Sequence, residues 1–122
     1  LLVGDRYDTD VAAGISVGIP TMLVLSGVSA PADVWASKIR ADYLGESVRD
    51  LITEYVGPQE RSDGYSCGEA KAVYQVAESV VHATGGTRLE RLRAADSLKW
   101  SLVEQVGVDS FAEGRISLDL GE

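Results

Sequence analysis

The opening of the chain constrains its fold more than any other part, because acidic residues follow directly after a short apolar run. Leu1-Leu2-Val3 ends at Gly4, and three aspartates follow within six positions. A helical segment and a second apolar run, 21–25, come next. A strand, a helix and a strand in this order predict two parallel strands joined by a helical crossover. Asp5 then lies at the carboxyl end of a strand, which is the edge where open α/β sheets bind ligands.

The clustering of these acids favours a bound cation. Carboxylates as close in sequence as those of Asp5, Asp8 and Asp10 repel one another unless a cation lies among them. A hard divalent ion held by oxygen ligands is the natural candidate. The alternative is structural, with Asp8, Thr9 and Asp10 serving as cap and first-turn residues of the helix. Both interpretations are open for Asp10, which can stabilise the turn and also serve a metal.

The same segment resembles a known motif. Gly4-Asp5-Arg6-Tyr7-Asp8-Thr9-Asp10, followed by Gly-Ile-Pro-Thr and Leu-Val-Leu-Ser-Gly-Val, is similar to the fourth conserved motif of haloacid-dehalogenase-like (HAD) phosphatases of the NagD or p-nitrophenylphosphatase-like branch. The resemblance extends from Leu1 to about Tyr55. It implies a Rossmann-like α/β core with a parallel sheet. It also implies hydrolysis of a small phosphomonoester, of the sugar phosphate or glycerol phosphate class, by an aspartate nucleophile.

The resemblance implies Mg²⁺ as the cofactor. Asp5 would be the direct metal ligand, and Asp10 would be a nearby acid that acts through water or orients neighbouring groups. Mg²⁺ keeps several waters in such sites, so one or two protein carboxylates suffice. The ion would neutralise charge on the transferring phosphoryl group, which is the main source of catalysis in this reaction.

The remaining motifs of the family are missing. Its nucleophile motif, two aspartates separated by one residue, is not found outside the helix start at 8–10, and the phosphate-binding hydroxyl and the lysine should lie upstream. The chain also opens inside an apolar run without an initiator methionine. We therefore expect the C-terminal fragment of a phosphatase, with no catalytic residue of its own and no activity alone. A second hypothesis is a non-catalytic binding or regulatory module with a vestigial metal motif.

The domain organisation follows from composition. Residues 1–56 are expected to form the C-terminal portion of the HAD-like core, and residues 57–64 a linker, because Pro58 and two glycines flank a polar run. Residues 65–122 then form a small α+β module. Within the core the predicted strands are 1–3, which is expected to be central, 21–25 and 42–44. The predicted helices are 9–17, closed by Gly18, one from Pro31 to 40, and one from 47 to 55. The last helix is expected to open with a Ser47–Asp50 capping box.

The module is predicted to follow a β-β-α-β order. Its elements are β structure over 65–76, a strand over 79–84, a Gly85-Gly86 turn, an amphipathic helix over 87–105 and a strand over 115–120. This order resembles the GNAT-like C-terminal module of some glycerol-3-phosphate phosphatases of the branch. The turn lacks the acetyltransferase glycine pattern for coenzyme A, so no cofactor-binding residue is predicted.

Composition indicates which classes of partner and which cellular compartment to expect. The net charge of −8 argues against nucleic acid and anionic membrane surfaces, which select basic proteins. Cys67 is the only cysteine, so no intramolecular disulfide forms, and we expect a reducing, cytoplasmic location. No apolar run is long enough to cross a membrane. The expected partner is a small phosphorylated metabolite, and association into a homo-oligomer is left open.

Overall fold

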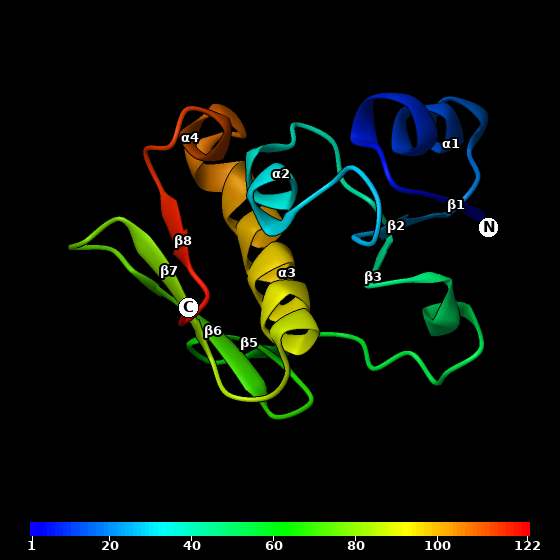
Figure 1. Ribbon diagram of the computed structural model, residues 1–122. Helices are drawn as coiled ribbons and strands as arrows, with labels where there is room; N and C mark the ends of the chain where they lie inside the picture. The colour runs from blue at the N-terminus through cyan, green and yellow to red at the C-terminus, as the bar shows by residue number, and fades with distance from the viewer. The chain divides into compact units, whose positions relative to one another are not determined.

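The computed structural model describes all 122 residues, and the chain divides into two compact units, Leu1–Tyr55 and Val56–Glu122. The first unit carries a parallel sheet with short helices, and the second a larger sheet with one long helix (Figure 1). None of the helices combines the length and the apolar composition needed to pass through a bilayer. The predicted α/β architecture, with a parallel sheet followed by an α+β part, is confirmed.

The sheet of the first unit contains three parallel strands in the order β1-β2-β3. They are β1 (Leu2–Gly4), β2 (Thr21–Val24) and β3 (Tyr43–Gly45). The prediction that the first strand is central was wrong. β2 pairs with both neighbours and all four of its residues are buried, whereas β1 pairs with β2 alone and is half-buried. The carboxyl ends of all three strands lie at one edge because the strands are parallel.

The first crossover differs from a regular helix at its start. The predicted helix 9–17 consists of a π-helical turn, η1 (Tyr7–Val11), and the α-helix α1 (Ala12–Val17). The wider turn arises because the amide of Val11 donates to the carbonyl of Arg6, 3.2 Å away, five residues earlier. Gly18 ends α1 as predicted, with a left-handed φ of 73° that glycine adopts without steric cost.

The later helices of the first unit are shorter than predicted. α2 (Pro31–Ala36) begins at proline as expected but ends before residue 40, because Ser37 adopts an extended conformation. The Ser47 hydroxyl accepts from the Arg49 amide and the Asp50 carboxylate accepts from the Ser47 amide, so the predicted capping box is present. It opens the 3₁₀ turn η2 (Val48–Leu51) rather than a helix reaching residue 55.

The second unit is a five-stranded sheet with a long helix. The strand order is β4-β5-β6-β7-β8, and neighbours are antiparallel except for the parallel pair β7–β8. The strands are β4 (Gln59–Arg61), β5 (Gly64–Cys67), β6 (Ala70–Gln75), β7 (Val80–Thr84) and β8 (Ser117–Asp119). The helices α3 (Arg88–Val106) and α4 (Asp109–Ala112) connect β7 to β8, as a parallel pair requires.

Two strands of this unit differ from the sequence prediction. β4 lies inside the predicted linker 57–64 and pairs with β5. An edge strand exposed on both faces is rich in polar residues, so its composition looks like that of a linker. The predicted β segment 65–76 is divided by a tight turn at Gly68, whose φ of 56° fits the first central position of a type II′ hairpin. Four strands therefore precede the helix, rather than two.

Helix α3 forms where the amphipathic pattern predicted a helix, and seven of its residues are buried. Thr87 and Glu90 form a capping box at its start, and it packs against β5, β6 and β7. Lys99 is fully buried although its side chain carries an ammonium group. Its ammonium group lies 4.5 Å from the ring centre of Trp100 and 5.8 Å from that of Phe111, which α4 contributes. Burial lowers the pKa of Lys99 to about 8.

His82 of β7 bridges two carboxylates. Its Nε2 lies 3.0 Å from Glu78 and its Nδ1 lies 3.0 Å from Asp119 of β8. The hydrogen bond with Glu78, followed by that with Asp119, raises the pKa of His82 above its ordinary value. The folded protein therefore favours the imidazolium more than the unfolded chain does, and His82 links β7 to β8 through Asp119.

We expect the replacement Glu78→Gln to lower the pKa of His82 in the folded protein, measured by NMR titration of the imidazole ring. Because the folded-state pKa lies above the unfolded value, this link stabilises the second unit below the unfolded pKa and is lost as the pH rises through the folded pKa. Glu104→Gln, on the exposed side of α3, is the control and should leave the titration unchanged. An unaltered pKa in the Glu78 variant would contradict the assigned contact.

Candidate functional site

Asp5 lies at the carboxyl edge of the parallel sheet, directly after β1. Its Oδ2 accepts a hydrogen bond from the backbone amide of Val28, 3.3 Å away in the loop after β2. The carboxylate forms no ion pair. The sequence predicted Asp5 at this edge. In the structure the side chain is half-buried and turned toward the loop after β2.

Asp10 holds the turn that carries Asp5. Its Oδ2 accepts the backbone amides of Asp5 and Arg6, both at 3.2 Å. Gly4 makes this approach possible, because a Cβ at that position would lie 2.2 Å from the Asp10 Cγ. Asp10 therefore fixes the backbone between β1 and η1. Such a role matches an acid that orients its neighbours, and it also satisfies amides that would otherwise lack partners.

The other polar residues of the motif point elsewhere. Arg6 and Asp8 form an exposed ion pair, with Nε–Oδ1 and Nη2–Oδ2 distances of 3.2 Å. Arg6 is thus paired with a neighbouring acid of the motif. Asp8 lies in the first turn of η1, as the structural interpretation expected, and its carboxylate binds Arg6. Thr9 is exposed within η1. The three acids do not converge on one point.

Among the motif acids, the Asp5 carboxylate could serve as one ligand of a magnesium ion, but the chain does not provide a complete set of ligands. No group of three or more His, Cys, Asp or Glu side chains in the structure is arranged to hold a metal ion. Asp5 offers a carboxylate without an ion pair, whereas Asp10 uses Oδ2 for backbone amides. Mg²⁺ at phosphoryl-transfer sites takes one or two carboxylates together with waters and phosphate oxygens. A magnesium site that used Asp5 would take its remaining ligands from outside this chain.

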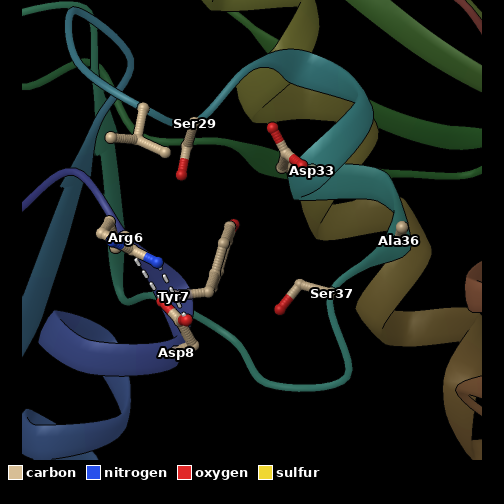
Figure 2. Close-up of a pocket in the computed structure, with 8 residues that line it drawn as sticks. Arg6, Tyr7, Asp8, Ser29, Asp33, Ala36 and Ser37 are labelled. Atoms are coloured by element: carbon tan, nitrogen blue, oxygen red, sulfur yellow. Dashed lines mark hydrogen bonds and ion pairs between the residues drawn. The ribbon is translucent and has the colours of Figure 1, made fainter.

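A pocket of about 370 Å³ opens next to the Asp5 turn. Figure 2 shows Tyr7 extending from η1 into this space, with Ser29 on the loop after β2 and Asp33 on α2 bordering it. Its lining combines three hydroxyls and three charged groups with small apolar side chains: Arg6, Tyr7, Asp8, Val28, Ser29, Asp33, Ala36 and Ser37. The pocket therefore combines polar and apolar surface and lies at the edge of the sheet where α/β proteins bind ligands.

Sequence reasoning missed the loop after β2. Two residues of this loop bond to Asp5, namely Val28 and Ser29. Gly27 has no Cβ and therefore leaves room for the Asp5 carboxylate. The available signal was their position after a second parallel strand, which places them at the same edge as Asp5. Sequence order cannot show which backbone or side-chain atoms of such a loop reach the neighbouring strand.

Asp5 follows a strand of a parallel α/β sheet, and Asp10 fixes the turn after that strand. This arrangement agrees with the HAD-like motif that the sequence resembles. Residues 1–51 match the family model of HAD-hydrolase-like proteins. The resemblance predicted from the Asp5 motif is thereby confirmed for the first unit.

The relatives with curated names are phosphatases. The chain is 39% identical over 51 residues to a dihydroxyacetone phosphatase of Corynebacterium glutamicum, covering 42% of this chain and 18% of that protein. It is 42% identical over 53 residues to an acid sugar phosphatase of Staphylococcus epidermidis, covering 43% and 20%. The match to a D-glycerol 3-phosphate phosphatase of Mycobacterium tuberculosis is 42% over 53 residues, covering 42% and 15%. The aligned segment is thus a fifth or less of each relative.

A solved structure extends the similarity into the second unit. The glycerol phosphate phosphatase of Mycobacterium tuberculosis in complex with magnesium matches with a TM-score of 0.61 and 29% identity. The match covers 81% of this chain and 29% of that protein. Since the first unit ends at Tyr55, a match of this extent includes much of the second unit. A GNAT-like origin of that unit stays a prediction.

Proposed function

We propose that this chain is the C-terminal part of a Mg²⁺-dependent phosphatase that hydrolyses a small phosphomonoester of the sugar phosphate or glycerol phosphate class. The observation that carries the proposal is Asp5, held at the carboxyl edge of a parallel sheet without an ion pair. The names of the relatives support the reaction class and the substrate size. The magnesium complex of the glycerol phosphate phosphatase supports the cofactor.

The two aspartates have different roles in this proposal. Asp5 contributes one carboxylate oxygen to the metal, and Asp10 holds the Asp5 amide through its Oδ2. Magnesium, when bound, would neutralise negative charge on the phosphoryl group. The chain's own residues fix the direction of the Asp5 carboxylate. A fixed ligand lowers the reorganisation needed when charge develops.

We expect the 122-residue chain alone to hydrolyse p-nitrophenyl phosphate no faster than buffer containing the same Mg²⁺. The chain offers one metal carboxylate and no nucleophile motif, and residues that act as a unit in catalysis lose nearly all activity when one is missing. The test is a colorimetric assay of the purified chain beside the longer protein whose sequence contains it. Turnover by the chain alone would contradict the fragment proposal, and an inactive longer protein would contradict the phosphatase proposal.

The second candidate is a binding or regulatory module whose metal motif is vestigial. It is favoured by the scattered directions of the three acids, because Asp8 binds Arg6 and Asp10 binds backbone amides. The two candidates differ in one measurable property. If Asp5 is a metal ligand of a phosphatase, activation of the enzyme by Mg²⁺ depends on Asp5. If the motif is vestigial, replacing Asp5 leaves the response to Mg²⁺ unchanged.

The second unit is proposed to be a packing or association module rather than a cofactor site. Glu90 places a carboxylate at the start of α3, where it accepts the Thr87 amide, and Arg91 donates to the carbonyl oxygens of Gly85 and Gly86. An acidic group at a helix start disfavours the binding of a pyrophosphate there. The division into a core portion, a linker and a module is likewise a proposal. The cytoplasmic location and self-association stay predictions.

A further inference from the structure

Three consecutive residues after β2 surround Asp5. The Ser29 hydroxyl donates to the Asp5 carbonyl oxygen at 2.6 Å, and the Val28 amide donates to the Asp5 Oδ2 at 3.3 Å. A Cβ at Gly27 would lie 1.8 Å from the same Oδ2, so only glycine leaves space for the carboxylate. With the Asp10 bond to its amide, Asp5 is held at its backbone nitrogen, its backbone oxygen and one carboxylate oxygen.

These contacts fix the orientation of the second carboxylate oxygen of Asp5, Oδ1. No hydrogen-bond donor or cation of the chain contacts Asp5 Oδ1. With Oδ2 bound to the loop and the backbone held on both sides, rotation of the carboxylate is restricted. Oδ1 is then the oxygen available to a ligand. Partners that orient a metal-binding side chain typically change metal affinity by about 10–100-fold when they are removed.

Ser29 makes the shortest of these loop contacts. Its side chain is buried, with 7% exposure, and its 2.6 Å bond joins the end of β1 to the loop after β2, 24 residues later. A buried hydroxyl that loses its partner is costly, so this bond is favoured over arrangements that leave the hydroxyl unpaired. The bond is made to the backbone of Asp5, which carries the carboxylate.

We propose that Ser29 is a positioning residue for the Asp5 ligand and that Gly27 supplies the space in which the carboxylate is held. The inference rests on the proposed function, in which Asp5 binds Mg²⁺. Neither residue touches the metal or the substrate in this proposal. Their effect is transmitted through the direction of the Asp5 side chain.

The test is a Mn²⁺ titration of the ¹⁵N-labelled longer protein that contains this chain, with Mn²⁺ as a paramagnetic probe for the magnesium position, because this chain alone offers one carboxylate of the proposed site. We expect selective broadening of the Asp5 and Val28 amide signals. Ser29→Ala should require about tenfold more Mn²⁺ for half-maximal broadening. Ser29→Thr, which keeps the hydroxyl, should restore the wild-type midpoint. Ser16→Ala is the matched control, because its hydroxyl donates to the Ala13 carbonyl of its own helix and not to Asp5.

The outcomes separate the two proposals. No selective broadening in the wild-type longer protein would overturn the metal assignment of Asp5 itself. Broadening that is unchanged in Ser29→Ala, or not restored by Ser29→Thr, would overturn the positioning role of the hydroxyl. Should Ser29→Ala fail to give a folded amide spectrum, Gly27→Ala decides. It keeps the hydroxyl bond but displaces the carboxylate, so a tenfold weaker response supports the inference and an unchanged response overturns it.

Discussion

Replacing Asp5 with asparagine in the complete enzyme is expected to reduce Mg²⁺-dependent hydrolysis of a phosphomonoester by about a hundredfold or more. Stabilisation of phosphoryl charge by a metal ion is worth several kcal/mol, and each 1.4 kcal/mol is about tenfold in rate. An asparagine keeps the size of the side chain and an oxygen for the Val28 amide, so the fold should be retained. The measurement is turnover as a function of Mg²⁺ concentration, with circular dichroism to verify folding.

A control isolates the effect of this one carboxylate. Asp63→Asn removes a negative charge from an exposed ion pair with Lys71 in the second unit. Exposed ion pairs contribute little to stability, so this variant should hydrolyse the substrate like the wild type. Wild-type rates and an unchanged Mg²⁺ dependence in the Asp5 variant would show that the motif is vestigial, and the binding-module hypothesis would replace the phosphatase proposal.

Leu23→Ala is expected to destabilise the first unit by about 2–5 kcal/mol, since it removes a fully buried side chain and leaves a cavity. Leu23 lies in the middle of β2, which pairs with both β1 and β3. A domain is stable by only about 5–15 kcal/mol, so this loss is a large fraction of the total. Hydrogen exchange of the β1, β2 and β3 amides, measured by NMR, gives the change for this unit separately from the second.

The matched control is Ile52→Ala, which truncates a side chain that is 87% exposed. Exposed substitutions of this kind change stability by about 0.5 kcal/mol or less. Equal exchange rates in the two variants would contradict the placement of β2 as the central strand. They would also remove the structural basis for the edge at which Asp5 lies.

Several features of the fold could be predicted because they depend on local chemistry. Gly18 closes α1, Pro31 opens α2, and Ser47 with Asp50 forms a capping box, all as their residue types indicate. The alanines of β6 illustrate the opposite case. They weaken the apparent strand pattern, yet Ala70 and Ala72 are buried in the sheet against which α3 packs. Small side chains are favoured there by close packing, which sequence propensity does not include.

The sequence by itself determined the class of the first unit, the edge on which Asp5 lies and the resemblance to HAD-like phosphatases. These follow from the order of apolar runs and acids, since parallel strands place their carboxyl ends together. Only the tertiary structure decided that Ser29 holds the Asp5 backbone, that β4 is a strand and that Lys99 is buried. Each of these depends on contacts between residues distant in sequence, and such contacts are set by packing rather than by local pattern.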